Sequence, residues 1–566
     1  MGMVRTAVAA NFAVWYLRLV GFLNLLGAVW LSLGNGIRRH NANDFFTPYL
    51  LTAGFTSGLF ALFLAITMRR RKRAAWILNL VVCGLFLLVF AAAMVPADTR
   101  SHPQNWIAFL LTAGFFMALL AGRREFRAKG DRANPKLAAA VAIGGVAIGG
   151  LLAAALVTVT NTSKGSTFGE RFAYALLRVV SLAGSDNDFI GITPPGWVNV
   201  TINVMSALLF LLVLYTAFRS PRGRVLLPQD EARLRELLGR YGERDSLGYF
   251  ALRRDKSVVW SPSGKSAVAY RVVGGVSIAS GDPIGDLEAW PGAIEAWLAE
   301  TREHAWIPAV MGASEEGGTV YARHGLDALE LGDEAIVDTG EFTLEGRAMR
   351  TVRQACNRVK RAGYTVRIRR HEDIPEAEME ELIGRADQWR YGVTERGFSM
   401  ALGRLGDPAD GRCMMVECYD AEGAPRALLS FVPWGPEGLS LDLMRRDRDS
   451  DNGLIEYMII NLIERADQIG IRQVSLNFAA FRSVFERGSR LGAGPVLRVW
   501  RSLLTFFSRW WQLESLYRAN AKYRPIWEPR YLLFAKNSEL PRVGLASARA
   551  EGFLVAPRLS SLLRRR

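Results

Sequence analysis

The sequence predicts a helical multi-pass membrane domain followed by a cytoplasmic α/β domain. The chain has 566 residues, half of them hydrophobic, and this length is too great for a single core. Apolar residues concentrate in the first 218 positions, where 19 basic against 7 acidic residues supply +12 of the net charge of +16. Such a segment indicates a membrane and its cytoplasmic surface. A secreted disulfide scaffold, a disordered chain and a simple soluble enzyme are disfavoured.

Six near-continuous apolar runs predict spanning helices, because each approaches or exceeds the roughly 20 residues that cross a hydrocarbon core. The runs are 12–33, 46–68, 75–95, 106–121, 137–159 and 198–218. The most basic loops follow the second and fourth runs, so these loops are expected in the cytoplasm. An even number of spans then places both termini in the cytoplasm, with the chain in the plasma membrane.

After position 218, charged helical segments alternate with short β-branched strands, as expected for an α/β domain. The most regular stretch predicts a strand, a helix and a strand: 439–444, 453–468 and 472–478. Leucines at every second position from Leu439 to Leu443 put Asp442 on the opposite face of the first strand. Glu456 lies in the first turn of the helix and Asn477 in the second strand, so these three polar residues could converge at one end. They could equally be caps and surface groups.

Two segments combine many basic residues with few acidic ones. A predicted helix over 346–362 carries six: Arg347, Arg350, Arg353, Arg358, Lys360 and Arg361. Positions 478–531 hold 10 basic and 3 acidic residues among 12 aromatic ones. A solvated face and core packing are the default interpretations. Contact with phosphate, on lipid or on RNA, is the functional interpretation.

Several motifs in order resemble the phosphatidylglycerol lysyltransferases of the multiple peptide resistance factor family. The clearest are SLDLMRRDRDSDNGLIEYMIINLIERADQIG, SLNFAAFRSVFERG, RLGAGPVLRVWR and SLYRANAKYRPIWEPRY, preceded by SGDPIGD, LGDEAIVDTGEFTLEGRAMRTVRQACNR and GFSMALGRLGD. The likeness covers about positions 225 to 540. It is closest to the actinobacterial form, here without the lysyl-tRNA synthetase to which such a domain can be fused.

The resemblance implies tandem GCN5-related acyltransferase folds behind a transmembrane domain at 1–218. A first subdomain is expected at 219–370, a second, catalytic one at 371–540, and a basic C-terminal tail at 541–566. The implied reaction moves lysine, or alanine, from charged tRNA to phosphatidylglycerol at the cytoplasmic leaflet. The product would lower the negative surface charge and give resistance to cationic antimicrobial peptides. Aminoacyl-tRNA, phosphatidylglycerol and the membrane are the implied partners, and a second copy of the chain is a further candidate.

The resemblance points to five of the expected site residues, and the strand–helix–strand pattern adds Asn477. Asp442, Arg445 and Glu456 are the expected catalytic residues, and the expected substrate-binding residues are Asn477, Lys522 and Arg524. Asp442 or Glu456 would hold the aminoacyl ammonium, while Arg445, Lys522 and Arg524 would hold lipid or tRNA phosphate. The general base stays open, because the substrate's own amine could serve. The donor is already an activated ester, so no cofactor and no metal are expected.

Three other functions remain as alternatives. An acetyl-CoA-dependent acyltransferase needs a glycine-rich pyrophosphate loop, and the candidate Arg490–Gly494 is one residue short of that pattern. A peptidoglycan-bridge aminoacyltransferase would share the folds and the donor but need no membrane anchor. A lipid transporter with an inert soluble domain is the third. Asp282 lies among Gly281, Pro283 and Gly285 and is expected to be a turn residue.

Overall fold

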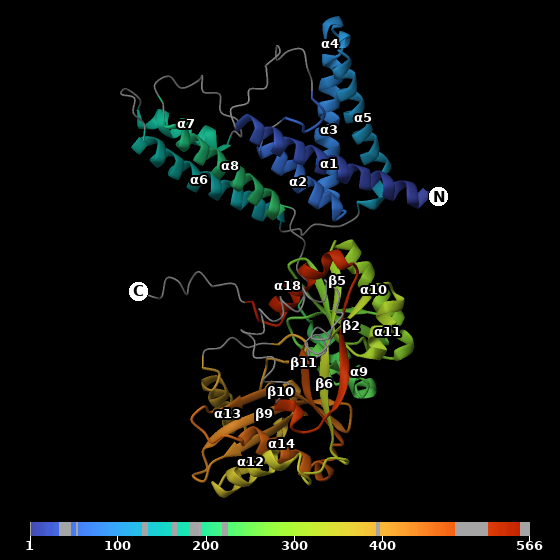
Figure 1. Ribbon diagram of the computed structural model, residues 1–566, viewed down its shortest axis with the longest axis vertical. Coiled ribbons are helices and arrows are strands. Elements are labelled where there is room, and N and C mark those ends of the chain that lie inside the picture. Colours follow the sequence, from blue (N-terminus) through green and yellow to red (C-terminus); the bar gives the residue numbers. More distant parts are fainter. Residues whose placement is uncertain are drawn as a thin grey trace. The chain divides into compact units, whose positions relative to one another are not determined.

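The computed structural model describes residues 2–32, 47–52, 55–126, 134–160, 167–180, 192, 194–217, 225–391, 397–480 and 519–554. The chain divides into two compact units (Figure 1). One is built mainly from Met1–Pro221 and is called the helical unit. The other, called the sheet unit, is built from Arg222–Arg302 and Trp306–Arg566.

In its described part, the helical unit has only helices as regular elements. They are α1 (Gly2–Ser32), α2 (Phe55–Arg69), α3 (Arg73–Ala93), α4 (Ala97–Ser101), α5 (Pro103–Ala121), η1 (Arg123–Glu125), α6 (Asn134–Thr160), α7 (Phe168–Val180) and α8 (Gly196–Ala217). Helices α1, α2, α3 and α5 share one core, which includes Leu17, Leu64 and Phe115. Helices α6, α7 and α8 share another, which includes Tyr174 and Ile202.

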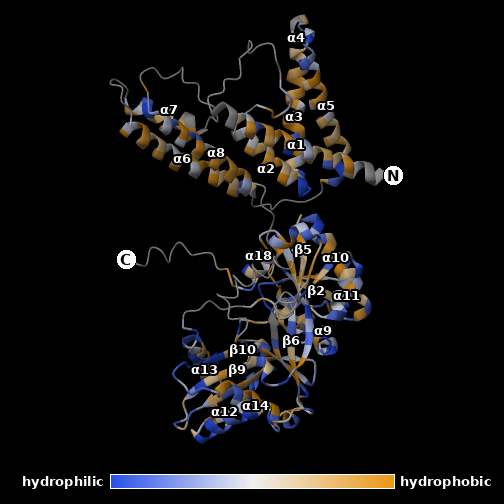
Figure 2. Cartoon of the chain, viewed as in Figure 1, coloured by the Kyte–Doolittle hydropathy of each residue, from blue (hydrophilic) through white to orange (hydrophobic). Residues whose placement is uncertain are grey.

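Five of these helices are long and apolar enough to cross a membrane. Their apolar segments are Thr6–Ala28, Arg73–Ala93, Pro103–Ala121, Lys136–Thr160 and Gly196–Ala217. Their outward side chains include Leu88 and Ile143, which are 69% and 73% exposed. Figure 2 shows the same hydrophobic colour along these helices. Apolar side chains that face outward along whole helices form a surface suited to acyl chains, which confirms the predicted membrane domain.

The second predicted span differs from the expectation, because its helix α2 has only 15 residues. At 1.5 Å per residue it is about 22 Å long, less than a hydrocarbon core of about 30 Å. The chain before it makes a turn at Tyr49 and Leu50, with Leu50 at a φ of 63°. Asn24 of α1 donates a hydrogen bond to the Leu50 carbonyl at 2.6 Å and accepts one from the Thr52 N–H at 2.8 Å. Non-helical backbone is tolerated at membrane depth when protein groups satisfy it in this way.

The sheet unit contains one sheet of twelve described strands, covered by helices. The strands are β1 (Ser257–Trp260), β2 (Ser266–Val273), β3 (Val276–Ser280), β4 (Ile284–Gly285), β5 (Ile307–Ala313), β6 (Asp327–Asp338), β7 (Thr365–Arg370), β8 (Met414–Tyr419), β9 (Pro425–Trp434), β10 (Gly438–Arg446), β11 (Gln473–Ala480) and β12 (Ile526–Phe534). The helices are α9 (Pro228–Tyr241), α10 (Trp290–Glu303), α11 (Glu315–Arg323), α12 (Arg350–Arg361), α13 (Glu376–Gln388), α14 (Leu454–Glu464) and α18 (Leu540–Ala550).

The sheet contains the same strand–helix–strand unit twice. Strands β3 and β5 are parallel and joined through α10, and strands β10 and β11 are parallel and joined through α14. The second of these units is the one that the sequence predicts at 439–478, and the structure confirms it. The sheet unit is therefore two repeats side by side, in agreement with the expected tandem acyltransferase folds.

The two repeats exchange strands. The order of the sheet is β1-β2-β3-β5-β12-β6-β11-β10-β9-β8-β7. Strand β6, which follows the first unit in the sequence, lies between β12 and β11, while β12, which follows the second unit, lies between β5 and β6. Each repeat therefore completes the sheet of the other.

This exchange changes the subdomain boundaries that the sequence predicts. Strand β7 falls before position 371 but pairs with β8 of the second repeat. Strand β12 falls in the predicted second subdomain but pairs with β5 of the first. The expected tail at 541–566 begins inside α18, whose Val543, Ala546 and Ala550 are buried in the core beneath the first repeat. Hydrophobic periodicity identifies strands and helices but not their partners, which explains these differences.

Candidate functional site

The candidate site lies where the parallel strands β10 and β11 part. They pair from Gly438 to Ser440 on β10 and from Gln473 to Ser475 on β11. Just beyond, β10 shifts register against β9 and β11 shifts register against β6. Bulges of this kind redirect side chains and end strand pairing. The two irregularities at one level of the sheet make a notch, which we define by Ser440, Asp442 and Asn477.

Asn477 bridges the two strands of the notch. Its backbone has a φ of 67°, a left-handed conformation that asparagine tolerates better than most residues. Its Nδ2 donates to the Leu441 carbonyl of β10 at 2.5 Å, and its N–H donates to Ser475 Oγ at 3.2 Å. Within the described part of the chain, Asn477 Oδ1 and Ser440 Oγ are buried without a hydrogen-bond partner. The notch therefore contains two buried acceptors that a polar ligand group could satisfy.

Asp442 lies at the bulge of β10 and is half-buried. Its Oδ1 accepts a hydrogen bond from the Leu402 N–H at 2.6 Å, so the carboxylate holds the segment 397–403 against the strand. The bulge also corrects the predicted alternation. Leu441 packs in the core under α14, whereas Leu443 packs in a separate cluster with Met379 of α13. The extra residue at Asp442 moves Leu443 to the other face of the sheet.

Glu456 and Lys522 form an ion pair, with 2.7 Å between Oε1 and Nζ. Glu456 lies in the first turn of α14, and Lys522 lies in the turn that precedes β12. Burial alone would raise the pKa of Glu456, but the hydrogen bond and the charge of Lys522 hold that pKa below its ordinary value. The sequence assigns these two groups to different parts of the substrate, while the structure brings them together.

The two predicted arginines lie at either side of this region. Arg445 is half-buried on β10, and its Nη1 donates to the Met444 carbonyl at 3.0 Å. Arg524 is exposed, has a φ of 51° and lies two residues after Lys522. Asn520 anchors the same turn, because its Nδ2 donates to the Leu476 carbonyl of β11 at 3.2 Å. The turn 519–524 therefore packs against the end of β11, next to the notch.

The start of α14 argues against the acetyl-CoA alternative. The first turn of the helix after such a strand is where an acyl-CoA pyrophosphate would bind, because helix N-termini attract anions. Here the connector before the N-cap residue Gly453 alternates arginine and aspartate and lacks the glycine-rich pattern that cradles a pyrophosphate. The loop candidate Arg490–Gly494 lies outside the described residues.

A buried polar cluster, which we call the central network, connects the exchanged strands to the notch. Arg530 of β12 donates to Glu334 of β6 at 2.7 Å and to Asp245 at 2.8 Å. Ser246 donates to the same glutamate at 2.5 Å, and Ser475 of β11 also donates to it. Burial would lower the pKa of Arg530, but the carboxylates of Glu334 and Asp245 raise it well above its ordinary value. Through Ser475 and the Asn477 N–H, the network reaches the notch.

The first repeat has an aspartate at the matching position. Ser280 is the last residue of β3 that pairs with β5, and Asp282 follows two positions later; Ser440 is the last residue of β10 that pairs with β11, and Asp442 follows at the same distance. Asp282 lies in the bend between β3 and β4, as the sequence predicts for a turn residue, but it is only 4% exposed.

The contacts of Asp282 leave no room for a ligand at this position of the first repeat. Its carboxylate accepts hydrogen bonds from the Ser314 N–H at 2.9 Å and from Ser314 Oγ at 2.5 Å. Helix α11 lies directly on it, because a Cβ at Gly317 would be 1.9 Å from Asp282 Oδ1. Burial and the neighbouring Asp245 carboxylate raise the pKa of Asp282 to about 7. The first repeat therefore has the same parting parallel strands as the notch, but the buried side chain of Asp282 occupies the space between them.

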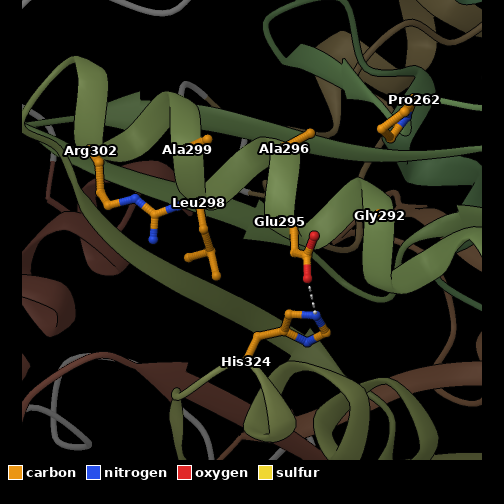
Figure 3. Close-up of a pocket in the computed structure, with 8 residues that line it drawn as sticks. All are labelled: Pro262, Gly292, Glu295, Ala296, Leu298, Ala299, Arg302 and His324. Atoms are coloured by element: carbon orange, nitrogen blue, oxygen red, sulfur yellow. Dashed lines mark ion pairs between the residues drawn. The ribbon is translucent and has the colours of Figure 1, made fainter.

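A surface hollow of about 550 Å³ lies elsewhere, on α10 and the end of α11. Figure 3 shows Glu295 and His324 facing each other there, with 3.7 Å between Oε1 and Nε2. None of the predicted site residues lines it. The described residues also contain no group of three or more His, Cys, Asp or Glu side chains that could hold a metal ion. The four cysteines are buried free thiols.

The sequence analysis missed the central network and Asn520. Arg530 interrupts a mostly apolar strand, and a buried charge requires a partner. That pattern could have marked Arg530, whereas Glu334 lies in a strand with four other acidic residues and does not stand out. The pairing itself could not be read from the sequence, because 196 positions separate the two residues.

Family comparisons match both units. Residues 235–534 match the family described as "Phosphatidylglycerol lysyltransferase, C-terminal", and residues 5–218 match "Transmembrane region of lysyl-tRNA synthetase". The first match covers more than half of the chain and includes all the predicted site residues.

Among curated proteins, the chain is 50% identical over 546 residues to a lysylphosphatidylglycerol biosynthesis bifunctional protein LysX of Rhodococcus opacus, covering 95% of this chain and 48% of that protein. It is 49% identical over 519 residues to the protein of the same name from Nocardia farcinica, covering 91% and 46%. The chain thus spans about half the length of these relatives.

Among solved structures, L-PGS from Bacillus licheniformis aligns with a TM-score of 0.52 at 23% identity, covering 59% of this chain and 98% of that one. At this identity the alignment supports the fold of the sheet unit.

Proposed function

The chain belongs to the phosphatidylglycerol lysyltransferase family, and on that premise we propose that it esterifies phosphatidylglycerol with lysine taken from lysyl-tRNA. The match across residues 235–534 is the observation that carries the proposal. The open notch of the second repeat, the charged pair beside it and the helical membrane unit are consistent with a lipid acceptor and a large charged donor. The same proposal places the basic loops, both termini and the reaction at the cytoplasmic face of the plasma membrane.

The chemistry requires positioning more than a covalent intermediate. The glycerol hydroxyl of the lipid attacks the carbonyl carbon of the aminoacyl ester, and the ribose oxygen of the tRNA leaves with a proton. We assign Asn477 Oδ1 as a further hydrogen-bond acceptor for the aminoacyl group, in addition to the carboxylate of Asp442 or Glu456, because it is buried and has no partner within the described residues. A correctly held ester and hydroxyl react as an intramolecular pair, which accounts for much of the expected acceleration. No cofactor is required in this scheme.

The charged pair would open when substrate binds. Glu456 then faces the positive charge of the aminoacyl group, and Lys522, with the exposed Arg524, faces phosphate. Glu456→Gln is expected to raise the KM for lysyl-tRNA about tenfold, because one charge-assisted hydrogen bond is lost. Lys522→Met is expected to raise one KM by a similar factor. The affected KM, for phosphatidylglycerol or for lysyl-tRNA, identifies the substrate whose phosphate Lys522 contacts. A loss of kcat alone in both variants would contradict these assignments.

Lipid labelling tests the function directly. Cells that express the chain are labelled in parallel with radioactive lysine and alanine, and their lipids are separated by thin-layer chromatography. Isolated membranes are assayed with and without RNase, and empty-vector cells are the control. The expected result is a labelled lipid with lysine that disappears with RNase. Label from alanine would change the donor, and no label with either amino acid would favour the lipid transporter.

An aminoacylated phosphatidylglycerol has a positive headgroup in place of a negative one. The expected consequence is a lower negative surface charge and weaker binding of cationic antimicrobial peptides. Peptide binding to cells with and without the chain measures this consequence. It is separate from the lipid assay, since a labelled lipid that stays in the inner leaflet would leave peptide binding unchanged.

A further inference from the structure

The segment 397–403 bonds to Asp442 of the notch but has no regular structure of its own. Residues 397–403 form neither helix nor strand, and a glycine in the left-handed region lies at each end, Gly397 with a φ of 126° and Gly403 with a φ of 71°. The Leu402 N–H donates to Asp442 Oδ1 at 2.6 Å. Because no helix or strand pairing fixes this N–H, the place of the segment depends on the groups that bond to it.

A buried carboxylate, that of Glu551, accepts three hydrogen bonds from the beginning of this segment. Its Oε2 accepts from the Phe398 N–H at 2.7 Å, and its Oε1 accepts from the Ser399 N–H at 3.1 Å and from Ser399 Oγ at 2.5 Å. The Gly397 N–H donates to the Glu551 carbonyl at 3.0 Å. Glu551 is only 3% exposed. The backbone N–H groups of three successive residues, 397 to 399, are therefore all bonded to Glu551.

Glu551 is the residue directly after α18, where a carboxylate is unfavourable for the helix itself. A negative charge at the C-terminal end of a helix faces the negative end of the helix dipole. Helix α18 packs against β2 and β3 of the first repeat, and its Ala546 lies in the same core as Phe398 and Leu402. The N–H groups of the segment offset the unfavourable position, so the carboxylate serves the segment rather than the helix.

Two cations just before β1 of the first repeat contact the same segment. The Nζ of the buried Lys256 lies 4.5 Å from the centre of the Phe398 ring. Arg253 Nη1 donates to the Ala401 carbonyl at 3.0 Å. The carbonyl of Ala401 and the N–H of Leu402 belong to one peptide group, so Arg253 binds one side of the group whose other side donates to the aspartate of the notch. The first repeat thus holds the segment, and the segment holds the aspartate.

We propose that Glu551 is a positioning residue for lysyl transfer: it fixes the segment 397–403, and the segment fixes the carboxylate of Asp442 through the Leu402 N–H. This inference rests on the proposed function, in which Asp442 is expected to orient the aminoacyl ammonium. The family match ends at residue 534, before α18 begins. A displacement of about 1 Å in a group that orients a substrate can lower the rate by up to about 10²-fold, so a residue outside the notch can control the reaction.

The test uses Glu551→Gln in the full chain in detergent micelles. The amide has one acceptor oxygen and an NH₂ group that cannot accept, so either orientation leaves the N–H of Phe398 or of Ser399 without its partner. The matched control is Glu417→Gln on β8, which changes another buried carboxylate that accepts three hydrogen bonds. Both variants lose one buried negative charge. The kcat per folded molecule is measured at saturating substrates, and hydrogen–deuterium exchange of residues 397–403 is measured by mass spectrometry.

In Glu551→Gln, kcat is expected to fall about tenfold, because the aspartate of the notch is no longer held in one place. The amides of 397–403 are expected to exchange about tenfold faster, since their local opening becomes easier. The KM for phosphatidylglycerol should stay unchanged. In Glu417→Gln, both kcat and the exchange of 397–403 should equal those of the wild-type chain. Equal losses of kcat in the two variants would overturn the inference, because they would report only a general loss of stability.

A double-mutant cycle separates positioning from a structural role. In the Asp442→Asn background, Glu551→Gln is expected to change kcat by less than about twofold, because the group that Glu551 positions is already altered. A full tenfold loss in that background would overturn the inference. If Glu551→Gln does not fold, Ser399→Ala takes its place, since it removes one of the three hydrogen bonds to the carboxylate. It is expected to lower kcat about threefold in the wild-type background and not in Asp442→Asn. An unchanged kcat in both backgrounds would also overturn the inference.

The inference and the proposed function fail separately. If the wild-type chain transfers no lysine, the proposed function fails, but exchange in the two glutamate variants still tests whether Glu551 fixes the segment 397–403. If lysine is transferred and Glu551→Gln changes neither kcat nor exchange, the function stands and the positioning role is wrong.

Discussion

The two repeats of the sheet unit place an aspartate at the same point of the same frame and use it in opposite ways. In the first repeat, Asp282 is buried beneath α11 and bonded to Ser314. In the second repeat, Asp442 is half-buried and holds the segment 397–403, and Asn477 bridges the strands beside it. One frame thus supports a closed, stabilising site and an open one with buried acceptors.

This difference shows that the fold alone does not decide where chemistry occurs. Both repeats have parallel strands that part beyond a serine, Ser280 in one and Ser440 in the other. Ser280 Oγ accepts a hydrogen bond from the buried Lys256 at 2.7 Å, whereas Ser440 Oγ has no partner within the described residues. Polar groups that a protein satisfies internally contribute to stability, and those left to a ligand contribute to function.

The largest effect is expected from removing the cation of the central network, because the network bonds strands of both repeats. Arg530→Met leaves the buried Glu334 and Asp245 without their cation, and we expect a loss of about 3–5 kcal/mol in the free energy of unfolding. Denaturant unfolding of the full chain in micelles, followed by fluorescence, measures it. Arg240→Met, in an exposed ion pair, is the control and should change stability by less than about 0.5 kcal/mol.

The exchange of β6 and β12 also predicts how many unfolding transitions the chain shows. Both repeats should unfold in one transition, since neither has a complete sheet alone. Two separate transitions, or a midpoint equal to that of the control, would show that the network does not connect the repeats.

Replacing Asp442 and Asp282 by asparagine, one at a time, tests which repeat supports lysyl transfer. Asp442→Asn is expected to lower lysyl transfer about 10²-fold, because the carboxylate expected to hold and orient the aminoacyl ammonium is lost. Asp282→Asn keeps the shape of the closed site and the bond from the Ser314 N–H, while its amide nitrogen would donate to Ser314 Oγ instead of accepting from it, and it should leave transfer per folded molecule unchanged. Initial rates at saturating substrates measure both effects. Equal losses in the two variants would contradict the assignment of chemistry to the second repeat.

A pH series tests whether Asp282 is confined as described. Its pKa is raised to about 7 in the folded chain from an ordinary value near 3.8, so the folded state keeps a proton that the unfolded state has lost. Stability from this group therefore falls as pH rises from 4 to 7. Relative to Asp282→Asn, the wild-type chain should lose about 2 kcal/mol between pH 5 and pH 7. Denaturation midpoints at pH 5, 6 and 7 give this difference, and a flat difference would show that the site is open to water.

The smallest effect concerns the backbone of the open site. Asn477 has a φ of 67°, which glycine adopts freely and alanine adopts at a cost. Asn477→Ala should therefore be about 1 kcal/mol less stable than Asn477→Gly, the reverse of the usual order in a strand. Both variants lose the bridge to the Leu441 carbonyl, so their difference isolates the backbone term. If alanine is the more stable of the two, the notch is not fixed by a left-handed residue.

The sequence contained much of the local structure and little of the long-range pairing. The alternating leucines and the helix at Glu456 predict the second strand–helix–strand unit correctly, because periodicity is a local property. The bulge at Asp442 and the turn before α2 were not predicted, since each depends on a distant partner, Leu402 in one case and Asn24 in the other. The strand exchange was missed for the same reason.

The candidate site follows the same rule. Motifs selected Asp442, Glu456, Asn477 and Lys522, and the structure places the first three on one strand–helix–strand unit and pairs Glu456 with Lys522. Whether each performs its predicted role stays a prediction. The ion pair itself spans 66 positions and is formed by a turn outside the unit, so no local pattern could indicate it.

The exchange of β6 and β12 also has a consequence for how the protein is made. A ribosome delivers β5 and β6 long before β12, yet β12 must lie between them. Until residue 534 has emerged, the first repeat exposes two unpaired strand edges, and edges of that kind invite wrong pairing. Folding of the sheet must wait for the last strand, and its many distant contacts predict slow closure. The strand that completes the first half is among the last parts of the sheet to be synthesised, so premature termination should leave both halves without a native core.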